Sequence, residues 1–121
     1  MEIWLPLVLA LLAPPPADDA AAGACENAAD HAVLARNEAR IDDEMEDCAY
    51  RCLTSDLACA RRCVQDKLPL TRACAGCFGG VVDCTTSNCK LACMFSDAGC
   101  RACRAEHCNP DFVTCAGIPA R

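Results

Sequence analysis

The sequence has few large apolar side chains from which to build a hydrophobic core. Its 121 residues include one tryptophan, one tyrosine and three phenylalanines, and Trp4 lies in the apolar run near the N-terminus. Much of the 54% hydrophobic content is alanine and cysteine, which fill an interior less well than leucine or phenylalanine. Burial of apolar surface therefore contributes too little to stabilise the fold of this chain alone, and another contribution is required.

Several functional classes lack their usual sequence features. The pI of about 4.7 and the scarcity of aromatic residues argue against nucleic-acid binding. No nucleophile elbow or phosphate-binding loop is present, and the sequence identifies no serine or cysteine partner for His31 or His107. The acidic run "DDEMED" at 42–47 lacks the alternating oxygen ligands and central glycine of an EF-hand. We therefore expect no catalytic residue, no cofactor and no calcium site.

Helix-breaking residues are absent from a long stretch of the chain. Between Gly23 and Pro69 there is neither glycine nor proline, which predicts helix over this segment. Strand signals are weak, whereas capping residues precede several later stretches: Ser87 before "NCKLACMF", and Ser96 or Asp97 before the stretch that ends at His107. The sequence predicts an all-α fold, a small disulfide-rich module of short helical hairpins with one longer N-terminal helix.

Charge divides this predicted module into two parts. Residues 26–47 hold eight acids and two arginines, a balance of -6, while residues 48–121 hold nine bases and six acids, a balance of +3. We assign an acidic N-terminal helix to 23–47, a cysteine-rich helical-hairpin domain to 48–117 and a tail to 118–121. Docking of the acidic helix on the basic part, or on a charged partner, is one interpretation; a solvated helix face is the other.

An apolar run, "IWLPLVLALLA", occupies residues 3–13. It is shorter than the ~20 residues that a bilayer-spanning helix needs. Small residues then fit signal-peptide cleavage after Ala22 or after Ala24. We expect residues 1–22 to be a signal peptide that leads the chain into the secretory pathway. A retained anchor is the alternative, since no Lys or Arg precedes the run. Lipidation of Cys25 is another, but it would leave an odd number of cysteines.

Cysteine is the residue that the chain has in excess. Fourteen cysteines exceed the ~8 to 10% that marks a disulfide scaffold, and the even number allows all of them to pair. Loop-closure entropy gives each bridge over 8 to 16 residues about 2.5 to 3 kcal/mol, so several bridges offset a thin core. We expect structural disulfides at Cys25, Cys48, Cys52, Cys59, Cys63, Cys74, Cys77, Cys84, Cys89, Cys93, Cys100, Cys103, Cys108 and Cys115.

The spacing of these cysteines bears on how they pair. "CAYRCLTSDLACARRC", residues 48–63, would align four thiols along one unbroken helix, an arrangement suited to a metal site. Cysteines four apart on a helix are too distant to bridge each other, whereas a turn at 54–56 sets them in two facing pairs. Residues 89–103 repeat the spacing with a second Ser-Asp. We predict two hairpins, with the pairs Cys48–Cys63, Cys52–Cys59, Cys89–Cys103 and Cys93–Cys100.

The other six cysteines have no pairing that the sequence determines. We expect them to join the acidic helix, a "CAGCFGG" loop at 74–80 and the C-terminal turn to the two hairpins. Two C-x2-C pairs, at 74–77 and 100–103, also fit a zinc site or thiol exchange. A copper(I) store, in which helices line their core with soft thiolate ligands, is the main alternative to a disulfide scaffold.

A resemblance covers about half the chain, from Cys59 to Gly117. The motifs "CAGCF", "DCTTSNC" and "CNPDFVTC", in that order, resemble exported cysteine-rich repeat proteins of myxobacteria and of unicellular algae such as dinoflagellates. The resemblance implies export and a disulfide-stapled scaffold, and it implies no catalytic activity.

Composition, leader and cysteines together predict a secreted or lumenal disulfide-stapled scaffold or interaction protein that is not an enzyme. The alternative is an extracytoplasmic protein that binds copper(I) or zinc through thiolates. We expect another protein as the partner, no nucleic acid, and no stable membrane anchor after signal cleavage; the sequence indicates no small molecule.

Overall fold

The structure is a computed structural model that describes residues 22–54 and 56–121. The expected signal peptide, apart from Ala22, lies outside these residues. The described parts are helical and contain no strand, so the all-α class is confirmed. None of the described helices has the length and apolarity that crossing a bilayer requires.

The acidic N-terminal segment is not the single longer helix that we expected. Helix α2 (Ala28–Arg36) ends at Asn37, whose backbone N–H and side-chain Nδ2 both donate to the carbonyl of Val33, at 3.1 and 2.7 Å. An asparagine side chain that bonds to nearby backbone in this way competes with the helix. A 3₁₀ turn, η2 (Glu38–Arg40), follows, and α3 (Ile41–Arg51) continues past the expected boundary at residue 47.

Two capping residues turn the chain back on itself to form hairpins. Asp56 accepts a hydrogen bond from the backbone N–H of Cys59 and begins α4 (Leu57–Lys67). Ser96 accepts one from the N–H of Gly99, at 2.9 Å, and begins α7 (Asp97–His107) directly after α6 (Lys90–Phe95). The helical hairpins α3–α4 and α6–α7 result. Ser87 does not cap α6, because it lies inside the preceding helix.

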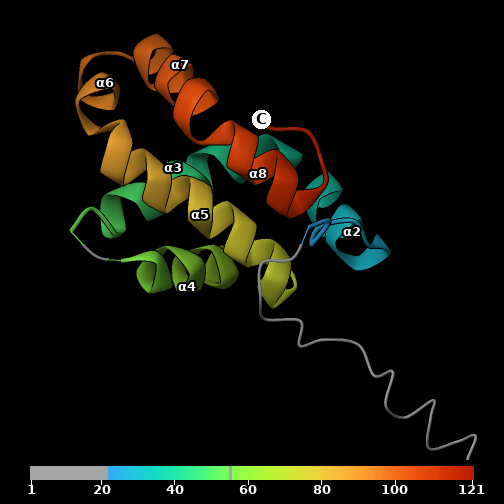
Figure 1. The fold of residues 1–121 in the computed structure, drawn as a ribbon. Helices are drawn as coiled ribbons and strands as arrows, with labels where there is room; N and C mark the ends of the chain where they lie inside the picture. Colours follow the sequence, from blue (N-terminus) through green and yellow to red (C-terminus); the bar gives the residue numbers. More distant parts are fainter. Residues whose placement is uncertain (1–21, 55) are drawn as a thin grey trace, which may run out of the picture.

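That preceding helix, α5 (Arg72–Asn88), is the longest described element at 17 residues. It crosses the middle of the molecule, and α3, α4, α7 and α8 (Asn109–Ala116) all pack against it (Figure 1). The predicted "CAGCFGG" loop is therefore wrong, because these residues form the first half of α5. A Cβ at Gly79 would lie 2.9 Å from the Cα of Arg61. Glycine here permits the close approach of α4 to α5.

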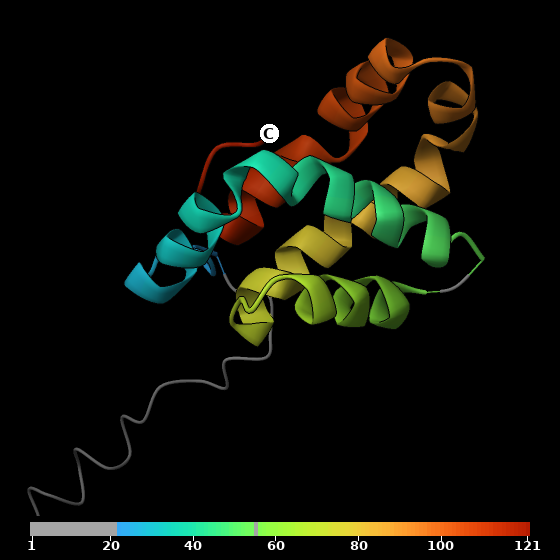
Figure 2. The same ribbon diagram turned by 180° about the vertical axis from the view of Figure 1, so that it is seen from behind.

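The hydrophobic core lies where α2, α3, α4 and α8 meet α5. Phe78 of α5 and Phe112 of α8 are its aromatic pair, in an edge-to-face contact with ring centroids 4.9 Å apart. Neither α6 nor α7 contains a buried residue. Figure 2 shows the α6–α7 hairpin extending away from α3 and α4. This hairpin depends on its covalent bonds more than on burial for its position.

Candidate functional site: a groove beside a stapled hairpin

All fourteen cysteines form disulfides, and no free thiol remains. Both hairpins are closed by the pairs expected from their spacing: Cys48–Cys63 and Cys52–Cys59 in the first, Cys89–Cys103 and Cys93–Cys100 in the second. The other three disulfides are Cys25–Cys74, Cys77–Cys115 and Cys84–Cys108. These three attach other segments to α5, not to the hairpins as we expected, because each hairpin uses all of its own four cysteines.

This pairing bears directly on the metal hypothesis. Copper(I) and zinc bind the deprotonated thiolate of cysteine, and here every sulfur is bonded to another sulfur. Among residues 22–54 and 56–121, no three histidine, cysteine or acidic side chains gather closely enough to hold an ion. Neither C-x2-C pair closes on itself, since Cys74, Cys77, Cys100 and Cys103 each bond to a cysteine of another segment.

The chain has two histidines, His31 in α2 and His107 in α7. Both side chains are exposed. The charged group nearest to the His107 imidazole in the described chain is Glu106, with Nε2 3.8 Å from a carboxylate oxygen. The expectation that neither histidine is a catalytic residue stays a prediction.

Part of the acidic segment pairs with the basic residues that follow it. Lys67 Nζ lies 2.7 Å from an oxygen of Asp47 and 3.7 Å from one of Glu44. Arg121 reaches Glu38 at 3.0 Å and Asp42 at 3.3 Å. Hydrogen bonds from Lys67 and then Arg51 hold the pKa of Asp47 below its ordinary value of 3.8. The structure thus shows docking along one part of the acidic segment, while Asp43 and Glu46 are solvated.

The α6–α7 hairpin carries the three most exposed of the large apolar side chains in the described chain. Leu91, Met94 and Phe95 are 69%, 74% and 84% exposed. All three belong to α6, which spans only six residues. Apolar side chains gathered on one surface are a common feature of protein contact sites.

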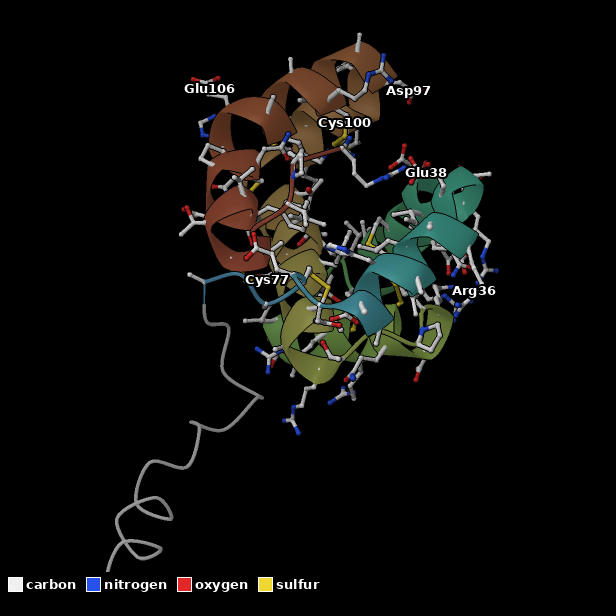
Figure 3. All side chains as sticks on the ribbon, turned by 90° about the vertical axis from the view of Figure 1, so that its right-hand side faces the viewer. Arg36, Glu38, Cys77, Asp97, Cys100 and Glu106 are labelled. Atoms are coloured by element: carbon white, nitrogen blue, oxygen red, sulfur yellow. A yellow bond between two sulfur atoms is a disulfide. The ribbon has the colours of Figure 1, made fainter. Side chains whose placement is uncertain are left out.

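Beside this hairpin lies a groove of about 400 Å³, within the size range of ligand sites. Helices α3 and α7 both pack on α5 but hardly touch each other, so the groove runs between them with α5 as its floor. Figure 3 shows Cys100 of α7 on one side and Glu38, at the start of the η2–α3 segment, on the other. Val81 and Val82 belong to the floor, and Met45 and Ala49 to the α3 wall.

The two walls of this groove carry opposite charge. Glu46 and Asp42, which also pairs with Arg121 at 3.3 Å, lie on the α3 wall, whereas Lys90, Arg101 and Arg104 lie on the wall formed by α6 and α7. Within the described part of the chain, these three cations have no carboxylate within 4.0 Å. Asp97 on α7 is the one acidic residue of the basic wall.

The sequence patterns did not reveal this groove. The α3 residues that line it share one helix face, which carries both acidic and apolar side chains. The opposite wall of the groove depends on the position of α7. That position depends on the Cys84–Cys108 disulfide, a pairing that the sequence leaves open.

The structure thus defines a small all-α domain held by seven disulfides, with an amphipathic groove on one side. Seven disulfides in such a chain indicate an oxidising environment, extracellular or lumenal. Comparison with protein-family models, with curated proteins and with solved structures finds no match to this chain.

Proposed function

We propose that this chain is an exported scaffold without catalytic activity that binds another protein through the α6–α7 hairpin and the groove beside it. One observation carries the proposal: neither helix α6 nor helix α7 contains a buried residue, yet the hairpin is closed by two disulfides and exposes Leu91, Met94 and Phe95. A hairpin whose helices add no buried residue to the core, but which is covalently fixed, suits the display of a rigid contact surface.

Export is the part of this proposal that rests on sequence as well as on structure. The apolar run at 3–13 and the small residues before Cys25 supply a signal peptide, and the disulfides require the oxidising compartment to which such a peptide leads. The resemblance of residues 59–117 to exported cysteine-rich repeat proteins supports the same compartment.

Mass measurement of the protein purified from its producing cells, before and after alkylation without reductant, tests the scaffold. Seven disulfides remove two hydrogens each, so the mass is expected fourteen hydrogens below that of the reduced chain, with no alkyl label. Free thiols that take up label after metal is removed from the protein would instead support the copper(I) or zinc alternative. A mature N-terminus at Gly23 or Cys25 in the same spectrum would identify the signal-peptide cleavage.

A further inference from the structure

We propose that the groove between α3 and α7 receives a single amphipathic helix of the partner protein. Its apolar stripe faces α5, its basic residues lie along α3, and its acidic residues lie along α6 and α7. This inference deepens the proposed function and rests on it, because it specifies the chemistry of the partner that the scaffold binds.

The form of the groove favours a helix as its occupant. The α3 residues that line it, at 42, 45, 46, 49 and 50, recur at steps of three and four and therefore share one helix face. The α7 residues at 97, 100, 101 and 104 do the same. Two helices that pack on a third without packing on each other leave a position that one more helix fills in helical bundles.

The lining requires apolar side chains from that helix. Val81 of α5 and Met45 and Ala49 of α3 are partly exposed in the lining, and Met94 of α6, which also lines the groove, has 74% of its surface exposed. Burying these groups against a partner removes apolar surface from water. An apolar stripe at steps of three and four residues is the pattern by which amphipathic helices occupy such grooves.

The charges determine the two flanks of the helix. A ligand of one sign would face a like-charged wall, either Asp42 and Glu46 or Arg101 and Arg104, and like charges brought together across an interface are unfavourable. A helix with basic residues on one flank and acidic residues on the other satisfies both walls. An anionic lipid surface would satisfy only the basic wall.

The length of the walls sets the length of the contact. Within α3, the groove lining runs from residue 42 to residue 50, eight helical steps, which is about 12 Å at 1.5 Å per residue. The bound helix is therefore in contact over about two turns. A synthetic peptide of about 18 residues covers this length and holds useful helicity.

Three such peptides, measured by fluorescence anisotropy with the intact oxidised protein, test the inference. All three carry the same leucine stripe at helical spacing. The first has lysine on one flank and glutamate on the other, the second has glutamate on both flanks, and the third has lysine on both. We expect the mixed peptide to bind about five- to tenfold more tightly than either of the others.

A reversal of the basic wall makes the test specific to this groove. The double variant Arg101→Glu and Arg104→Glu should prefer the all-lysine peptide over the mixed one by a similar factor. Arg62→Glu and Arg72→Glu together form the matched control, since both arginines are exposed and neither lines the groove; this variant should keep the wild-type order. Ala49→Trp, which fills the groove, should weaken all three peptides.

Other results would overturn the inference. Equal binding of the three peptides, an order unchanged by the Arg101 and Arg104 variant, or no binding at all would each exclude the mixed-flank helix. Self-association in sedimentation that Ala49→Trp abolishes would assign the groove to a second copy of this chain. Binding to anionic vesicles that competes with the mixed peptide would assign it to a lipid surface. The mass and the alkylation of the same sample show separately whether the seven disulfides of the scaffold are present.

Discussion

Asp30 and Thr71 are joined by two hydrogen bonds across 41 residues of sequence. The backbone N–H of Thr71 donates to Oδ1 of Asp30 at 2.8 Å, and the Thr71 hydroxyl donates to Oδ2 at 2.6 Å. Asn27 donates to the same carboxyl group at 2.7 Å. Asp30 is buried, with 1% of its surface exposed, and Thr71 is the N-cap of α5. The carboxylate therefore fixes α2 against the helix end that favours negative charge.

Removal of this carboxylate should destabilise the oxidised protein. In Asp30→Ala, the Thr71 N–H and hydroxyl lose a charged acceptor in a partly buried position, which costs about 2 to 3 kcal/mol. Urea unfolding followed by circular dichroism measures the loss. Asp43→Ala is the control, because Asp43 is exposed on α3 and should change the unfolding free energy by less than about 0.5 kcal/mol. An equal loss in both variants would show that Asp30 does not hold α2 in place.

Local sequence signals were sufficient for the all-α class and for the two hairpins. The caps at Asp56 and Ser96 lie between cysteine pairs whose spacing fits a facing ladder, so the pairs of each hairpin follow from its own segment. Glycine at 117, with a φ of 75°, ends α8 as its position after "FVTCA" indicates.

Features that depend on distant contacts could not be predicted in this way. Asp30 is one of eight acids in the acidic segment, and nothing in the sequence distinguishes it before Thr71 is known to lie beside it. Gly76 and Gly79 indicated a loop by propensity, but Gly79 lies in a helix because α4 packs against it. The three disulfides to α5 and the groove depend on the same tertiary arrangement.

Two disulfides of unequal span should differ in their contribution to stability. Cys25 and Cys74 are 49 residues apart and fully buried, while Cys93 and Cys100 are 7 apart and only partly buried. Loop-closure entropy predicts that Cys25→Ala with Cys74→Ala costs about 4 kcal/mol, and that Cys93→Ala with Cys100→Ala costs about 2. Guanidinium unfolding of both purified variants gives the two values. A larger loss for the shorter bridge would show that the α6–α7 hairpin contributes more to the folded state than its exposure indicates.

Asp47 and Lys67 should give the protein a defined response to acid. Lys67 lowers the pKa of Asp47 most, followed by Arg51. The pairing of Asp47 with these two cations therefore stabilises the fold above pH 3.8. This contribution disappears as the pH falls through the lower, folded-state pKa. In Lys67→Met, a carboxyl NMR titration should show the Asp47 pKa moving up toward 3.8; in Arg51→Met it should move less. A pKa that stays unchanged without Lys67 would mean that the ion pair between α3 and α4 does not persist in solution.

Gly79 and Gly80 are neighbours in α5 that should respond in opposite directions to the same substitution. A Cβ at Gly79 would lie 2.9 Å from the Cα and 3.0 Å from the backbone N of Arg61, so Gly79→Ala forces α4 away from α5 and should cost about 1 to 3 kcal/mol. Nothing lies within 4 Å of a Cβ at Gly80, so Gly80→Ala should stabilise by about 0.5 to 1 kcal/mol through helix propensity. Thermal unfolding of the two oxidised variants measures both shifts. A stabilising Gly79→Ala would mean that α4 and α5 are not in backbone contact, and the position of the α3–α4 hairpin on α5 would then have to be revised.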